Sequence, residues 1–153
     1  MEQLHRYLAE HKRVTDVLFT GGDPMVMSAE ALRRYIDPIL KSKELAHLDT
    51  IRIGSKSLAY WPYRYLTDPD AKAMLDLFAD VAASGKQLAF QAHFTNPREL
   101  ETPAVQEAIR MIRMTGAEIR SQSPLIRHVN NSAQDWARMW RLQARLGVVP
   151  YYM

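Results

Sequence analysis

Short apolar runs alternate with longer amphipathic segments along the chain. The segments between the runs repeat apolar residues at helical spacing, as Leu32, Ile36 and Ile39 do, and an amphipathic N-terminal segment precedes the first run. The runs are rich in branched or aromatic residues, as β-strands are. They cover residues 14–19, 49–54, 86–91, 117–122 and 147–152. The pattern predicts five strands, each preceded by a helix.

Residues that favour helix ends mark most of these boundaries. Ser28 is placed to cap one helix, and Asp68-Pro69 and Thr102-Pro103 each combine a cap with a proline at the first helical position. Ser132 and Asp135 resemble a capping box. Three helices run into a glycine, the usual left-handed stop, at Gly85, Gly116 and Gly147.

Strands that alternate with helices pair in parallel through right-handed crossovers, so the predicted fold class is α/β. Two architectures satisfy this order: an open doubly wound sheet, or part of a (βα) barrel of the TIM type. Both place function at the carboxyl ends of the strands. The last predicted strand has no loop after it, so we expect a site there to lack a wall.

Composition narrows the class of protein. The chain has 153 residues, of which 47% are hydrophobic, enough for one domain with a sizeable core. No run is long enough for a membrane span and no signal peptide is present, so a cytoplasmic location is expected. The net charge of +3 is spread along the helices, so we predict no nucleic-acid binding. The absence of cysteine excludes disulfides, a thiol nucleophile and a cysteine-ligated cluster built from this chain.

Candidate chemistry begins at FTGGDPMVM, residues 19–27, directly after the first predicted strand. Gly21 and Gly22 could expose backbone N–H groups to an anionic or polar ligand, with Asp23 beside them to accept a hydrogen bond from an ammonium group. The alternative is an ordinary strand-to-helix turn whose glycines supply positive φ.

Two histidines also follow predicted strands. His93 could act as a base, a metal ligand or a ribose contact, although a lone histidine is more often an ordinary polar residue. His93 and His128 could together contribute to a metal site, but no carboxylate accompanies them at a motif spacing. We therefore predict no metal site.

Several motifs agree with one family. DVLFTGGDPMVMSAEAL, IRIGSKS, AHFTNPRELETPAVQEAI, SQSPLIRHVNNSAQDWARMW and GVVPYYM resemble, in order and spacing, the central part of the lysine 2,3-aminomutase family of radical S-adenosylmethionine (SAM) enzymes. The similarity covers essentially the whole chain. It implies a partial TIM-type barrel of about five parallel strands with flanking helices, in which residues 1–153 form the central part of a radical SAM domain.

The resemblance implies an isomerase. In the family a [4Fe-4S] cluster reduces SAM to a 5′-deoxyadenosyl radical, which takes hydrogen from an amino acid held on pyridoxal phosphate (PLP). The amino group then moves between the α and β carbons, while the protein supplies placement and exclusion of competing reactions. The resemblance places SAM at Gly21, Gly22, Asp23, Pro24 and Gln122. It places Ser55, Lys56, His93 and Ser123 close to SAM or PLP.

The chain also departs from the family. The family's C-x3-C-x2-C cluster motif lies upstream of this segment and its PLP-binding lysine lies downstream, so we expect the isolated chain to be inactive. The lysine-specific enzymes carry LLRGVND where this chain has LIRHVNN. Asn131 therefore replaces an aspartate that pairs with the distal ammonium of the substrate, and His128 replaces a glycine. Lysine is in doubt as the substrate, and another amino acid is an alternative.

Two functional classes remain. The chain is either part of a radical SAM aminomutase, or a non-catalytic barrel relic or SAM or small-molecule binding module that needs a partner chain. An unrelated small α/β domain with a coincidental GGDP turn is a third, weaker alternative. Because an incomplete barrel exposes strand edges and apolar side chains, we expect the isolated chain to form oligomers or to need the missing flanking polypeptide.

Overall fold

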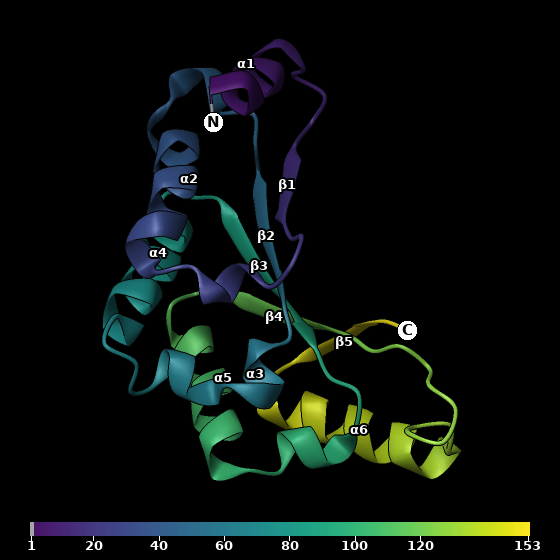
Figure 1. The fold of residues 1–153 in the computed structure, drawn as a ribbon. Helices are drawn as coiled ribbons and strands as arrows, with labels where there is room; N and C mark the ends of the chain where they lie inside the picture. Colours follow the sequence, from purple (N-terminus) through teal and green to yellow (C-terminus); the bar gives the residue numbers. More distant parts are fainter. Residues whose placement is uncertain (1) are drawn as a thin grey trace.

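The computed structural model describes residues 2–153, which form a five-stranded parallel sheet with helices on one side (Figure 1). The strands are β1 (Asp16–Phe19), β2 (Thr50–Ser55), β3 (Gln87–His93), β4 (Glu118–Gln122) and β5 (Val149–Tyr152). The helices are α1 (Glu2–Glu10), α2 (Ala29–Lys41), α3 (Ser57–Tyr60), α4 (Ala71–Ala83), α5 (Pro103–Met114) and α6 (Ala133–Leu146). Four 3₁₀ helices are η1 (Pro24–Val26), η2 (Lys43–Leu45), η3 (Pro62–Tyr65) and η4 (Pro97–Leu100). All five predicted strands are confirmed, whereas α3 and the 3₁₀ helices were not predicted.

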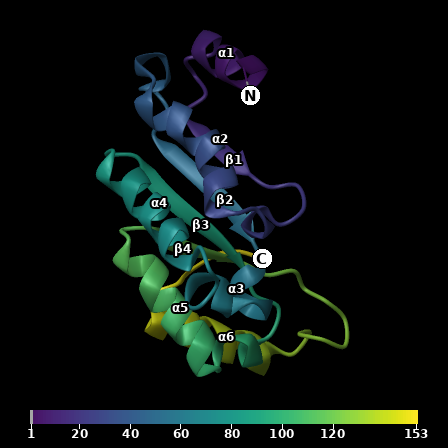
Figure 2. The same ribbon diagram turned by 60° about the vertical axis from the view of Figure 1, so that its left-hand side comes forward.

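Strand order decides between the two architectures. The strands pair in parallel in the order β1-β2-β3-β4-β5, so each crossover moves one strand in the same direction. In a doubly wound sheet the order reverses at a switch point, and here it does not. Right-handed crossovers that all move one way bring the helices to one face. Figure 2 shows this layer, with α2, α4 and α5 lying over the sheet. The α/β prediction is therefore confirmed, and the strands follow one another in the order found in a segment of a (βα) barrel.

The two faces of the sheet differ in burial. In β2, Ile51 and Ile53 are fully buried, whereas Arg52 and Gly54, which alternate with them, are only partly buried. Alternate residues of a strand point to opposite faces, so the isoleucines pack under the helices. Each fully buried side chain of this size contributes about 1.5–3 kcal/mol to stability. Within residues 2–153, no helix combines the length and the apolar character needed to cross a bilayer.

Most predicted helix ends are confirmed. Ser28 accepts a hydrogen bond from Ala31 N at 3.1 Å, and Thr102 accepts one from Val105 N at 3.3 Å. Ser132 caps α6, and the three glycine stops have φ of 84°, 90° and 74°. The Asp68-Pro69 prediction was wrong, because α4 begins at Ala71. Its N-cap residue, Asp70, makes no capping bond.

The loop between β4 and α6 contains a strained residue. His128 has φ of 63°, the left-handed region that favours glycine, and it is the residue that replaces a glycine of the resembled family. We expect His128→Gly to raise the free energy of unfolding by about 1 kcal/mol, because the left-handed conformation costs a residue with a Cβ about that much. Urea unfolding measures the change. The control is Arg127→Gly, at an exposed neighbour without positive φ, which should lose stability. Equal losses in both variants would contradict the assignment of strain.

Candidate functional site

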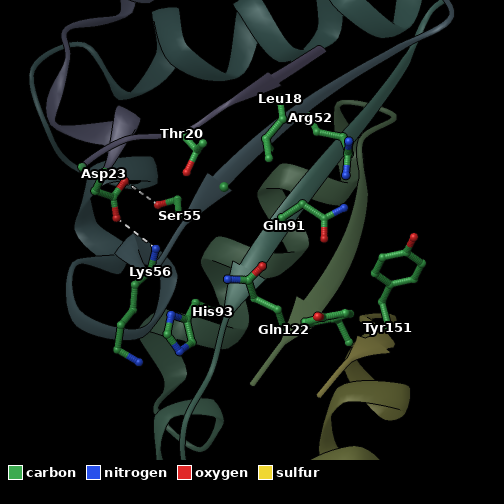
Figure 3. A pocket seen from close by; sticks show the side chains of 13 residues that line it. Leu18, Thr20, Asp23, Arg52, Ser55, Lys56, Gln91, His93, Gln122 and Tyr151 are labelled. Carbon is green, nitrogen blue, oxygen red and sulfur yellow. Dashed lines mark hydrogen bonds between the residues drawn. The ribbon is translucent and has the colours of Figure 1, made fainter. Parts of the chain in front are cut away.

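A cavity of about 510 Å³ opens on the face of the sheet that the helices leave free. All five strands, or the turns after them, contribute to its lining (Figure 3). In Figure 3, Asp23 and Ser55 lie on one side, His93 and Gln122 lie below, and Tyr151 lies on the opposite side. The cavity therefore lies where parallel α/β sheets place their ligands, around the carboxyl ends of the strands.

The structure brings together six of the residues singled out from the sequence. The six that line the cavity are Gly22, Asp23, Ser55, Lys56, His93 and Gln122. Gly21 and Pro24 line a smaller depression beside the same turn. Ser123 is buried outside the cavity lining, and Asn131 is exposed. The contacts of these residues with SAM, PLP or substrate stay predictions.

Other cavity residues were missed by sequence reasoning. They are Leu18, Thr20, Arg52, Gly54, Gln91, Tyr151 and Tyr152. Strand periodicity could have found two of them. Gln91 lies two residues before His93 on β3, and Arg52 lies on the opposite face of β2 from its buried isoleucines, so both face the open side of the sheet. The tyrosines lie on β5, whose residues are all exposed.

The glycine turn after β1 leaves two successive backbone N–H groups without a partner among residues 2–153. Gly21 and Gly22 have φ of 95° and 73°, and an added Cβ would meet nothing within 4 Å at either position. Within residues 2–153, neither glycine donates its backbone N–H to another group of the protein. Successive N–H groups in such a turn suit an anionic group of a ligand. The glycines thus supply positive φ, as an ordinary turn requires, and also leave donors free.

Asp23 anchors this turn to the end of β2. Its Oδ1 accepts hydrogen bonds from Ser55 Oγ at 2.7 Å and Met25 N at 3.0 Å. Its Oδ2 accepts from Lys56 N at 2.9 Å and Tyr60 Oη at 3.2 Å. A carboxylate has about four acceptor positions, and four donors occupy them. The contact between Asp23 and a ligand ammonium stays a prediction, and in this conformation four protein donors already surround the carboxylate. Asp23 positions the turn.

Lys56 is also engaged by the protein. Its Nζ donates to Thr95 Oγ1 at 2.9 Å and to Glu99 Oε1 at 3.1 Å. Glu99 is itself held, because its Oε2 accepts from Thr95 N at 2.6 Å. The ammonium of Lys56 is thus neutralised by a carboxylate on η4.

Three polar groups in or near the cavity have no hydrogen-bond partner among residues 2–153. The Nε2 atoms of His93 and Gln91 and the Oγ atom of Ser123 are buried without a hydrogen bond. Burial, followed by the nearby charge of Lys56, lowers the pKa of His93, while Glu99 opposes the shift. His93 is therefore neutral at pH 7, with one ring nitrogen able to donate and the other able to accept. Buried polar atoms without partners suit ligand hydrogen bonds.

The metal hypothesis gains no support from the geometry. His128 is exposed in the loop between β4 and α6, away from the cavity lining. Over residues 2–153, no three side chains of histidine, aspartate or glutamate are grouped so that they could hold a metal ion.

The segment around Asn131 is held by its neighbour. Asn130 is 1% exposed, and its Nδ2 donates to Thr95 O and Pro124 O, both at 2.8 Å. Its Oδ1 accepts from Ile126 N at 2.6 Å. Asn130 therefore fixes the loop, while the exposed side chain of Asn131 is free for other contacts.

Comparisons with known proteins find relatives along almost the whole chain, although no family profile matches it. A protein of Aquifex aeolicus (strain VF5), provisionally named L-lysine 2,3-aminomutase, is 31% identical over 147 residues, covering 96% of this chain and 38% of that protein. The L-lysine 2,3-aminomutase of Clostridium subterminale is 30% identical, covering 96% and 32%. The glutamate 2,3-aminomutase of Clostridioides difficile (strain 630) is 26% identical, with the same coverages. The chain thus spans about a third of the length of these relatives.

Proposed function

Because the chain belongs to the lysine 2,3-aminomutase family along 96% of its length, we propose that it is the SAM-binding part of a radical SAM, PLP-dependent amino acid 2,3-aminomutase. One observation carries the proposal. The free N–H groups of Gly21 and Gly22 and the unpartnered atoms of Gln91 and His93 lie around the carboxyl ends of neighbouring parallel strands. These glycines belong to the GGDP motif of the family.

The residues present fit SAM. Its carboxylate suits the N–H groups of Gly21 and Gly22, because successive backbone donors bind anions. Its adenosine hydroxyls and ring nitrogens suit the neutral His93 and the amides of Gln91 and Gln122. The open face between them offers about 510 Å³, which is within the usual size of small-molecule sites. Bound SAM supplies the 5′-deoxyadenosyl group that, in this family, removes a hydrogen from the substrate.

The other two cofactors do not fit residues of this chain. A [4Fe-4S] cluster needs cysteine thiolates, and the sequence has none. PLP needs a lysine amine free to react, whereas the Lys56 amine at the cavity is paired with Glu99. We therefore assign their ligands to polypeptide outside this sequence, and this chain's own role to binding and orientation. Asp23 holds the turn, and His93, kept neutral, offers hydrogen bonds without adding charge.

The lack of cysteine favours the second candidate, a module that binds SAM or another small molecule and needs a partner chain for chemistry. Release of 5′-deoxyadenosine distinguishes the two candidates. With a reductant, iron and sulfide, the isolated chain should bind SAM but release no 5′-deoxyadenosine above a control without protein. Release by a complex that contains the chain would favour the aminomutase, and release by the chain alone would contradict the argument from cysteine.

Calorimetric titration with SAM tests the binding proposal. Gly22→Ala should weaken SAM binding by about tenfold, because alanine resists the left-handed φ of 73° and moves the backbone donors. The matched control is Gly85→Ala. Gly85 also has positive φ, at 84°, with no atom within 4 Å of an added Cβ, but it ends α4 away from the cavity. Both variants should lose similar stability, whereas only Gly22→Ala should lose affinity. No saturable binding of SAM by the wild-type chain would contradict the proposal.

We also propose that Asn131 sets substrate preference. A neutral amide supplies no charge to a distal ammonium, so the site should disfavour lysine relative to amino acids without one. In an active enzyme that contains this segment, Asn131→Asp should raise turnover of lysine relative to glutamate by about tenfold, since a charge-assisted bond adds on the order of 1.5 kcal/mol. Competition assays with both amino acids measure the ratio. An unchanged or lower ratio would remove Asn131 from substrate selection.

A further inference from the structure

Helix η3 carries two polar side chains that are almost completely buried behind the cavity. Arg64 is 2% exposed and Tyr65 is 1% exposed, and neither lines the cavity. A guanidinium and a phenol lose their hydration when they are buried, so each needs hydrogen-bond partners inside the protein. Both reach the segment that follows β1.

Arg64 holds the downstream end of the glycine turn. Its Nε donates to Met25 O at 2.9 Å, and its Nη2 donates to Met27 O at 3.0 Å. Asp70 neutralises the guanidinium, with Nη1 to Oδ1 at 2.5 Å, and Asp70 Oδ2 also accepts from Ala29 N at 2.6 Å. The main chain from Met25 to Ala29 is therefore held by one ion pair, whose arginine is buried and whose aspartate side chain is 34% exposed.

Tyr65 reaches Asp23 through two serines. Tyr65 Oη lies 2.5 Å from Ser57 Oγ, which lies 2.6 Å from Ser55 Oγ, which donates to Asp23 Oδ1 at 2.7 Å. The carboxylate of Asp23 can only accept hydrogen bonds, so Ser55 donates its single hydroxyl proton to Asp23. Ser57 must then donate to Ser55, and Tyr65 must donate to Ser57. In this series of hydrogen bonds, each hydroxyl proton therefore points toward Asp23.

The donor and acceptor roles in the hydrogen-bond series from Tyr65 to Asp23 do not change near neutral pH. Burial raises the pKa of Tyr65 far above its ordinary value, so its hydroxyl keeps its proton. The ring is also fixed, since it packs edge-on against Phe90 at a centroid distance of 5.9 Å. Tyr65 is therefore a rigid donor at the buried end of the chain.

We propose that Arg64 and Tyr65 are positioning residues for the glycine turn. Arg64 fixes the main chain after the turn and Tyr65 fixes Asp23 through Ser57 and Ser55, so that Gly21 and Gly22 keep their conformation without a ligand. The inference rests on the SAM-binding role proposed for these glycines. It extends that role to two residues that touch neither the cavity nor a ligand.

The experiment removes single hydroxyl groups from the hydrogen-bond series that links Tyr65 to Asp23. Tyr65→Phe keeps the ring and its packing, and Ser57→Ala breaks the chain in the middle. Tyr63→Phe is the matched control, because Tyr63 lies on the same 3₁₀ helix, is 55% exposed and makes no side-chain hydrogen bond in residues 2–153. Amide ¹H–¹⁵N spectra of the ligand-free proteins report the conformation at Gly21 and Gly22, and calorimetry with SAM reports affinity.

We expect Tyr65→Phe and Ser57→Ala each to shift the Gly21 and Gly22 resonances and to weaken SAM binding by about tenfold, the scale of one buried hydrogen bond. The double variant should bind SAM no more weakly than the worse single variant, because both changes break the same chain. Tyr63→Phe should match the wild type in both measurements.

Two results would overturn the inference. One is unchanged Gly21 and Gly22 resonances in both single variants, with only a general fall in melting temperature. The other is additive losses in the double variant, which would mean that the hydroxyls act separately. If the wild-type chain binds no SAM, the proposed function fails, and the glycine resonances of the ligand-free proteins still decide the positioning role.

Discussion

Asp23→Asn is expected to weaken SAM binding by about a hundredfold and to lower the free energy of unfolding by about 3 kcal/mol. The carboxylate accepts four hydrogen bonds, two of them from the backbone N–H groups of Met25 and Lys56. An amide can accept at one atom only, and its NH₂ group would face donors. The turn would then detach from the end of β2, and the free N–H groups of Gly21 and Gly22 would lose their position. Calorimetric titration and urea unfolding measure the two effects.

The control for this prediction is Asp76→Asn. Asp76 makes an exposed ion pair with Lys72 one helical turn away, a type of pair that contributes about 0.3–0.5 kcal/mol. This variant should leave SAM affinity unchanged. If Asp23→Asn binds SAM as tightly as Asp76→Asn does, Asp23 does not position the binding turn.

Arg64→Met is expected to cost about 2–4 kcal/mol of stability, less than the roughly 3–5 kcal/mol of a fully buried ion pair, because the side chain of Asp70 is 34% exposed. Methionine fills much of the volume, but the carbonyl oxygens of Met25 and Met27 lose their donors and Asp70 loses its counter-charge. Denaturant unfolding at pH 7 measures the loss. Arg34→Met is the control, since the Arg34 side chain is 73% exposed and, within the described residues 2–153, pairs only with Glu30.

The loss in Arg64→Met should depend on pH. Hydrogen bonding to Arg64, the largest cause, lowers the pKa of Asp70 in the folded protein, although partial burial opposes the shift. A lowered carboxyl pKa stabilises the fold above the unfolded value of about 4 and stops doing so as the pH falls through the folded value. The stability gap between wild type and Arg64→Met should therefore narrow below about pH 4. A gap that stays constant from pH 7 to pH 3 would show that Asp70 is not the partner that matters.

Local patterns predicted the elements because their causes are local. Alternating branched residues indicate strands, and Ser28 and Thr102 cap helices through bonds to residues three positions away. The same reasoning failed at Asp68-Pro69. The helix begins after Asp70, whose carboxylate serves Arg64 and Ala29, and the Ala29 contact joins residues 41 positions apart. A distant partner cannot be read from a local motif.

The position of the candidate site was predicted from the sequence, but the contacts of its side chains were not. Strand ends can be placed from sequence, so His93 and Gln122 were expected near the GGDP turn and line its cavity. The hydrogen-bond partners of each side chain were not predictable from the sequence. Asp23 bonds to residues 32, 33 and 37 positions away, so its role as an anchor of the turn could not be read from the local motif.

The sequence by itself determined the order of strands and helices, most of the helix caps, the glycine turn and the family, because these depend on residues close together in the chain or on ordered motifs. Only the tertiary structure decided that the sheet is singly wound, that Arg64 and Tyr65 support the turn from behind, and that Lys56 is paired with Glu99. Those features depend on hydrogen bonds and charges that meet only after the chain has folded, and burial decides how strongly each one acts.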